Sequence, residues 1–129
     1  MSLLVERARF GQKIILQKVY ITGKKFMLSL LYIPTKNKKE AKKIARLLLD
    51  ERLIACANIV PRIESLYSWK GEIQVETETL LLLKTQTTLV KRVIARVKEI
   101  HSYTVPCIEA ISITDRNAEY EKWVKKVMK

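Results

Sequence analysis

Hydrophobic and polar positions become regular from Phe26 onward. An apolar run rich in strand formers covers residues 26–33 and stops at Pro34, which predicts a buried strand. Asn37 then provides a helix cap, with Glu40 three residues later in the manner of a capping box. The following helix has one apolar face and one basic face, formed by Ala41, Ile44, Ala45 and Leu48 and by Lys39, Lys42, Lys43 and Arg46. We interpret the basic side of this one helix as a solvated surface.

Extended segments follow this helix. Residues 55–60 and residues 63–69 are each predicted as a strand, and the Lys-Gly pair at 70–71 supplies a turn. Residues 72–79 alternate between polar and less polar side chains, and residues 80–83 are continuously apolar. The resulting strand of about 14 residues is much longer than the ~5–6 that are typical. We therefore expect one end to project and to pair with another chain.

Two more helices are predicted from apolar side chains at helical spacing. The first begins near Thr87 or Thr88 and is followed, after a loop over residues 101–106, by a strand over residues 107–114. The second closes the chain, with Trp123 expected in the core. The two apolar stripes consist of Val90, Val93, Ile94, Val97 and Ile100, and of Tyr120, Trp123, Val124 and Val127.

The order of these elements predicts the fold class. Strand, helix, two strands, helix and strand, with a helix at the end, is the α+β, ferredoxin-like βαββαβ sandwich with an extra C-terminal helix. Such a fold has an antiparallel sheet with helices on one face. We assign residues 26–129 to this domain, since 129 residues leave room for one. Residues 1–25 form an N-terminal extension of uncertain structure, strand-like only at 14–16 and 19–21.

The net charge of +12 raises the question of a polyanionic partner. Residues 1–25 carry six basic side chains and one acidic one, and the remainder carries 19 and 12, with no block of five consecutive basic residues. No strand has the basic and aromatic pattern of an RNA-binding sheet, and no apolar run approaches the ~20 residues of a membrane span. We therefore expect no nucleic-acid and no membrane partner. The two cysteines, far apart in sequence, favour a reducing, cytoplasmic location.

Few residues carry recognisable chemistry. His101 is the only histidine, and Cys56 and Cys107 are the only cysteines. Thiolate and imidazole groups suit copper or zinc, and ligands can be pooled at a subunit interface. We therefore predict His101, Cys107 and Cys56 as candidate metal ligands. A nucleophile pair of Cys107 and His101 stays open as an alternative from another class, although no catalytic residue and no required cofactor is predicted.

Five segments, in the right order, resemble the CutA family of divalent-cation-tolerance proteins. They span about 104 residues, from Phe26 to Lys129. The segments are Glu51–Pro61, the Ser-Leu-Tyr-Ser-Trp-Lys-Gly hairpin at 65–71, Glu78 with the apolar run and Lys84-Thr85, His-Ser-Tyr-Thr-Val-Pro at 101–106, and Tyr120-x-x-Trp123. The chain departs from the family pattern at Ser102, where proline is usual, and at Cys107, where glutamate is usual.

The resemblance implies a ferredoxin-like protomer in a PII-like homotrimer, with long strands that pair across subunits. It also implies a role in tolerance of divalent metal ions, copper especially, without an established catalytic activity. By analogy with PII proteins, the candidate residues of the intersubunit cleft are Tyr67, Trp69, Lys84 and Tyr103. The alternative function is a PII-like regulatory or scaffold trimer that binds a small anion or a protein partner in these clefts.

Overall fold

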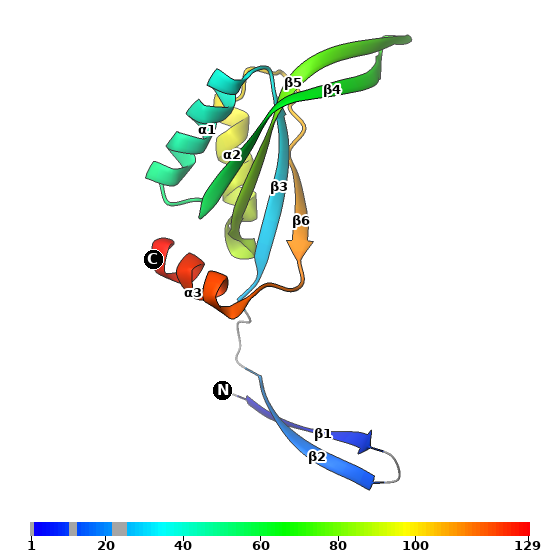
Figure 1. Cartoon of the computed structure of the whole chain (residues 1–129), viewed down its shortest axis with the longest axis vertical. Coiled ribbons are helices and arrows are strands. Elements are labelled where there is room, and N and C mark those ends of the chain that lie inside the picture. Colours follow the sequence, from blue (N-terminus) through cyan, green and yellow to red (C-terminus); the bar gives the residue numbers. More distant parts are fainter. Residues whose placement is uncertain (1, 11–12, 22–25) are drawn as a thin grey trace.

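The computed structural model describes residues 2–10, 13–21 and 26–129. Figure 1 shows the order of the elements along the chain. The strands are β1 (Ser2–Phe10), β2 (Lys13–Ile21), β3 (Leu28–Thr35), β4 (Cys56–Trp69), β5 (Glu72–Gln86) and β6 (Glu109–Ile113). The helices are α1 (Lys38–Asp50), α2 (Val90–Ile100) and α3 (Ala118–Val127), with a short 3-10 turn at Thr87–Leu89 before α2.

The main sheet has four antiparallel strands in the order β4-β5-β3-β6. The helices α1 and α2 lie side by side on one face of this sheet, and α3 lies across its lower end (Figure 1). This arrangement confirms the predicted α+β, ferredoxin-like class. The strands β3 and β5 occupy the centre, so their apolar residues are buried most completely.

The core lies between the two central strands and the two helices. Leu31 and Ile33 of β3 point to the same face because side chains alternate along a strand, and both are fully buried. Ile44 of α1 and Val93 of α2 belong to the same cluster and are also fully buried. The predicted apolar faces of both helices are therefore confirmed.

The helix α1 begins where its capping signals predict. Asn37 has extended backbone angles, and its Oδ1 accepts a hydrogen bond from the Glu40 N–H at 2.9 Å. The Glu40 carboxylate reaches back one residue further than a capping box requires, since its Oε1 accepts from the Lys36 N–H at 3.1 Å. Two backbone donors at the start of α1 are thereby satisfied.

A long hairpin, which we call the arm (residues 63–78 of β4 and β5), projects beyond the helices (Figure 1). Residues 56–60 and 63–69 belong to one continuous strand, β4, so the prediction of two separate strands at 55–60 and 63–69 is wrong. The register shifts between Val60 and Ile63 because Pro61 lacks an N–H for the ladder and a β-bulge absorbs the interruption. Lys70 and Gly71 turn the chain with φ values of 51° and 80°. The predicted long strand, β5, is confirmed at 15 residues.

Several details of the C-terminal third differ from the prediction. Trp123 is 43% exposed, so its placement in the core is wrong for the single chain. Val124 of α3 and Met128, which follows the helix, are the buried contacts of this segment, whereas Trp123 stacks on the Tyr120 ring with centroids 5.7 Å apart. The last strand begins at Glu109, two residues after Cys107.

The N-terminal extension contains an antiparallel hairpin. Its strands pair from Ser2 with Ile21 to Phe10 with Lys13. The segments 14–16 and 19–21, which look strand-like in sequence, both lie in β2. The strand β1 escapes prediction because it carries Glu6 and Ala8, residue types that are depleted in strands.

Candidate functional site

His101 ends α2 and is 8% exposed. Its Nδ1 accepts a hydrogen bond from the Tyr103 N–H at 3.0 Å, which assigns the proton to Nε2. The Nε2–H in turn donates to the Pro34 carbonyl oxygen at 2.9 Å. Both ring nitrogens are thus engaged within the chain, and this geometry leaves no imidazole lone pair for a metal ion. His101 holds its loop against the end of β3.

Glu78 and Tyr103 form a half-buried acidic centre next to this loop. The Tyr103 hydroxyl donates to Glu78 Oε2 at 2.7 Å, and Glu78 is only 7% exposed. Within residues 26–129 no basic side chain forms an ion pair with Glu78. Burial, the hydrogen bond to Glu78 and the charges of Glu76 and Glu40 raise the pKa of Tyr103 far above its usual value. The site therefore favours positive charge.

Cys107 borders the same centre. Its Sγ donates to Glu109 Oε1 at 3.1 Å. Desolvation, the hydrogen bond to Glu109 and the charges of Glu109 and Glu78 raise the pKa of the thiol to about 11. A catalytic thiol needs a lowered pKa and a base in contact with it. The pKa of Cys107 is raised, and its contact is the Glu109 carboxylate and not the imidazole of His101, which is bonded to Pro34 and Tyr103. The geometry therefore disfavours a Cys–His nucleophile pair.

Cys56 lies elsewhere. Its Sγ and the Tyr120 hydroxyl are 3.2 Å apart, and it is paired in register with Lys84 across β4 and β5. Lys84 pairs in turn with Leu30 of β3, whereas His101 contacts Pro34. The positions of Cys56 and His101 along the strand direction therefore differ by four residues, or about 13 Å. The three predicted metal ligands are not brought together. No group of three or more metal-binding side chains occurs in the part of the chain that the structure describes.

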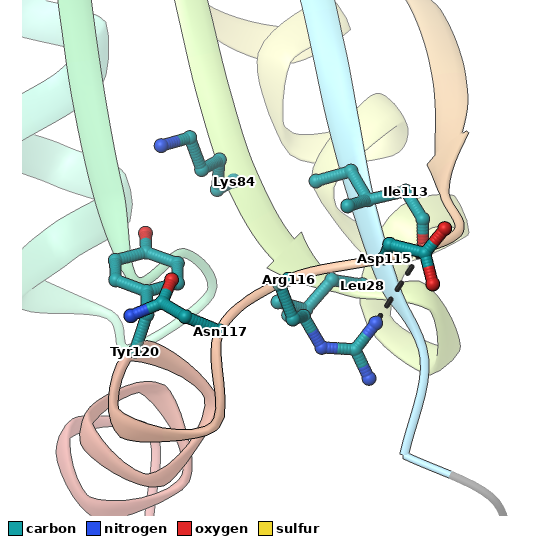
Figure 2. A pocket seen from close by; sticks show the side chains of 7 residues that line it. All are labelled: Leu28, Lys84, Ile113, Asp115, Arg116, Asn117 and Tyr120. Carbon is teal, nitrogen blue, oxygen red and sulfur yellow. Dashed lines mark hydrogen bonds between the residues drawn. The ribbon is translucent and has the colours of Figure 1, made fainter.

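A cavity of about 370 Å³ opens between α3 and the ends of β3 and β5 (Figure 2). Lys84 is the only predicted cleft residue in its lining, and its Nζ lies 5.0 Å from the centre of the Tyr120 ring. The remaining lining residues are Leu28, Ile113, Asp115, Arg116 and Asn117. The lining has two cationic side chains, Lys84 and Arg116, and one carboxylate, Asp115, and Arg116 is already paired with Glu121. The anion-binding alternative stays a prediction.

The other three cleft candidates lie on or beside the acidic face of the arm, which carries Glu72, Glu76 and Glu78. Tyr67 is 40% exposed, and its pKa is raised by a hydrogen bond to Glu76, by desolvation and by the charges of Glu76 and Glu78. Trp69, at the tip, is 54% exposed. Tyr103 joins this face through its bond to Glu78. These three residues therefore share an acidic surface.

Two structural residues of the site are missing from the predicted set. Glu40 accepts from the Ser102 N–H at 3.0 Å through Oε2, while its Oε1 caps the start of α1. Arg116 donates to the Phe26 carbonyl oxygen at 2.5 Å and to Glu121 at 3.2 Å, and so anchors the entry to α3. The capping pattern reveals Glu40 as a local signal, but its contact with Ser102 joins residues 62 positions apart. No local pattern encodes that contact.

Replacing Glu40 with glutamine is expected to lower the free energy of unfolding by about 1–3 kcal/mol at pH 7, because an amide nitrogen cannot accept from a buried N–H. Burial raises the pKa of Glu40, but hydrogen bonds from Ser102 and Lys36 outweigh it and leave the pKa below its usual value. The ionised carboxylate therefore contributes stability above a pH of about 4.3, and this is lost as the pH falls through the lower folded pKa.

Urea unfolding at pH 7 and at about pH 3 checks this expectation, since the two proteins should converge in stability at the lower pH. The matched control is Glu64→Gln on the exposed part of β4, with a change within about 0.5 kcal/mol. A Glu40→Gln effect that is equal at both pH values would contradict the role of the ionised carboxylate.

The fold and site together define a ferredoxin-like α+β protein with a projecting hairpin and a cation-favouring centre at its base. Residues 29–127 match the family described as "CutA1 divalent ion tolerance protein". Because this match covers most of the chain, the protein belongs to the CutA1 divalent ion tolerance family.

Curated relatives and solved structures agree with this assignment. The "Divalent-cation tolerance protein CutA" of Thermus thermophilus is 42% identical over 100 residues, which is 78% of this chain and 97% of that protein. Human "Protein CutA" is 37% identical over 108 residues, 84% of this chain but only 59% of the human protein. The crystal structure of CutA1 from Ehrlichia chaffeensis superposes with a TM-score of 0.78 at 38% identity, covering 81% of this chain and 97% of that one.

Proposed function

We propose that the protein is a homotrimer that binds divalent metal ions, copper included, and acts in tolerance of those ions without catalysing a reaction. The observation that carries the metal-binding part is the acidic centre of Glu78 and Tyr103, which Cys107 and its partner Glu109 border. Glu78 is buried without a basic partner among residues 26–129, and its charge acts on the Cys107 thiol. A bound cation would offset this uncompensated charge.

The donor set shapes the proposal. A thiolate with carboxylate oxygens suits a soft or borderline divalent ion such as copper or zinc. His101 is not among the proposed ligands, because both of its ring nitrogens are engaged by Tyr103 and Pro34. Since no three donors converge within the described residues of one chain, we propose that a neighbouring subunit or water completes the coordination.

Assembly is supported by the two faces of the arm. Leu66, Ile73 and Val75 share one face in the cross-strand register and are 64%, 78% and 58% exposed. The opposite face carries Tyr67, Trp69 and three of the arm's four glutamates, Glu72, Glu76 and Glu78. Apolar side chains grouped this way on an exposed hairpin lose contact with water when another copy covers them. The long strand β5 thus has a physical reason to pair across subunits.

Zinc binding is expected to weaken at least tenfold in Cys107→Ser, because a hydroxyl is a much poorer ligand than a thiolate. Since the thiol pKa is about 11, binding must displace its proton at neutral pH. The wild-type affinity should then rise about tenfold per pH unit between pH 6 and 8. Isothermal titration calorimetry in buffers of different ionisation heat measures both the affinity and the released proton.

The matched control for this titration is Cys56→Ser, which removes the other thiol at the Tyr120 contact. It should leave the zinc affinity unchanged. A Cys107→Ser protein that binds zinc like the wild type, or a wild-type affinity that does not vary with pH, would contradict the proposed thiolate ligand.

The names of related proteins give different cellular locations. One relative is named "Protein CutA 1, chloroplastic" in Oryza sativa, and a solved homologue from Archaeoglobus fulgidus, 37% identical over 80% of this chain with a TM-score of 0.77, is titled a periplasmic divalent cation tolerance protein. Within the residues that the structure describes, no helix is long and apolar enough to cross a membrane. A cytoplasmic location stays a prediction.

A further inference from the structure

The outer surface of the helical layer concentrates much of the positive charge of the chain. The helix α1 has five basic and two acidic residues and α2 has four and one, so together they carry a net charge of +6, half of the total of +12. These helices are 40 residues or more apart in sequence, and the fold places them side by side on one face of the sheet (Figure 1). Charge that is dispersed along the sequence therefore becomes one surface.

This surface, which we call the basic face, has eight exposed cations. They are Lys38, Lys39, Lys42, Lys43, Arg46, Lys91, Arg92 and Lys98. None of them forms an ion pair within residues 26–129. Three nearby carboxylates are engaged elsewhere, since Glu40 accepts from Lys36 and Ser102 N–H groups, and Glu51 and Glu99 both bind Arg96. Asp50, the other acidic residue of α1, lies at the C-terminal end of the helix and is exposed.

The arrangement on α1 works against the helix itself. Lys39, Lys42, Lys43 and Arg46 lie opposite the buried face of α1. Each of them has two of the others three or four residues away. Like charges at these spacings destabilise a helix. A surface that only needed to be solvated would gain from alternating acidic residues, whereas this stripe of four cations has none within it. The stripe is better suited to a partner of high negative charge.

In contrast to the expectation from sequence of a solvated surface without a nucleic-acid partner, we infer that the basic face binds the phosphate backbone of double-stranded nucleic acid. The stripe on α1 runs over seven residue steps, about 10 Å of helix. A duplex presents one negative charge per ≈ 1.7 Å of its axis, so about six phosphates lie within that length. The second row, on α2, is one helix spacing away, at about 8–10 Å. Two parallel rows of cations match the high charge density of a duplex, without reading its sequence.

The composition of the two helices favours a duplex over other polyanions. Neither helix contains an aromatic residue, so the basic face offers no platform for stacking the bases of a single strand. Most apolar side chains of both helices are turned into the core; the exceptions are Leu47, which is half-buried, Leu49, which is 42% exposed, and the small, exposed Ala95. Helices that bind a membrane surface combine positive charge with an apolar face that inserts into the lipid. The basic face has charge alone.

Fluorescence anisotropy with a labelled duplex of about 20 base pairs tests this inference across about 50 to 200 mM salt. The test variant combines Lys39→Gln, Lys42→Gln, Lys43→Gln and Arg46→Gln, which keeps good helix formers in α1. The matched control removes the same charge from exposed cations outside the basic face, through Arg62→Gln, Lys122→Gln, Lys126→Gln and Lys129→Gln. Thermal unfolding and zinc titration of both variants confirm that fold and metal binding are retained.

Duplex binding by the α1 variant is expected to be at least tenfold weaker at about 50 mM salt, with a shallower dependence of log K on log salt, while the control stays within about threefold of wild type. Equal weakening in the two variants would assign binding to net charge and overturn the inference. So would the absence of binding by the wild type. Binding to vesicles of phosphatidylcholine with about one-third phosphatidylserine, but not to the duplex, would overturn it in favour of a membrane.

Discussion

Replacing Leu48 with alanine is expected to lower the free energy of unfolding by about 2–5 kcal/mol. Leu48 is fully buried in the cluster that joins α1 to the sheet and α2. Truncation removes apolar contact and leaves a cavity that the neighbouring side chains of β3 and β5 cannot fill, because both strands are fixed in the centre of the sheet. Equilibrium urea unfolding at one protein concentration measures the loss.

Leu49→Ala is the matched control, one residue further along the same helix. The same atoms are removed, and the change in helix propensity is the same, but Leu49 is 42% exposed. Its cost is expected to stay below about 1 kcal/mol. Comparable losses in the two variants would show that α1 does not pack on the sheet through the face that contains Leu48.

The double variant Leu66→Lys and Val75→Lys is expected to dissociate the assembly. These two residues are directly opposite each other on the apolar face of the arm. Covering an exposed apolar side chain of this size is worth about 1.5–3 kcal/mol, and an ammonium group in its place also has to lose water. The arm projects from the protomer, so the substitutions leave the core intact (Figure 1).

Sedimentation equilibrium checks this outcome. The wild type should sediment at three times the protomer mass of 15.0 kDa, about 45 kDa, and the double variant at the protomer mass. The control places two lysines on exposed positions of the helical layer instead, through Leu49→Lys and Ala95→Lys. A control that dissociates equally, or a wild type that sediments as a monomer, would contradict assembly through the arm.

Much of the fold is predictable because its signals are local. The capping pattern of Asn37 and Glu40, the apolar faces of α1 and α2 and the length of β5 all depend on residues within a few turns or one strand. The wrong predictions concern residues whose burial depends on contacts with distant parts of the chain. Trp123 has helical core spacing, but in the single chain α3 meets the sheet through Val124, and the tryptophan ring is left on the surface.

The candidate site was predictable in residue type and much less so in arrangement. The thiols and the imidazole are recognisable in the sequence as metal donors, but in the fold they lie in different places and form hydrogen bonds to different partners. His101 is held by Pro34, 67 positions away, and Cys56 by Tyr120, 64 positions away. Glu78, the buried carboxylate without a basic partner among residues 26–129, is only one of several glutamates in an alternating strand. Burial distinguishes it, and burial is a property of the fold.

The sequence by itself determined the class of the fold, its family resemblance and the presence of an unusually long strand, because periodicity and short motifs are written in neighbouring residues. Only the tertiary structure decided how the charges and donors group. In the folded chain both ring nitrogens of His101 form hydrogen bonds within the protein. Glu78 and Tyr103 lie at the base of the arm, close enough to Cys107 for the charge of Glu78 to act on its thiol. The basic residues of α1 and α2, dispersed in the sequence, form one face. The physical reason is that burial and charge density depend on which distant segments pack together.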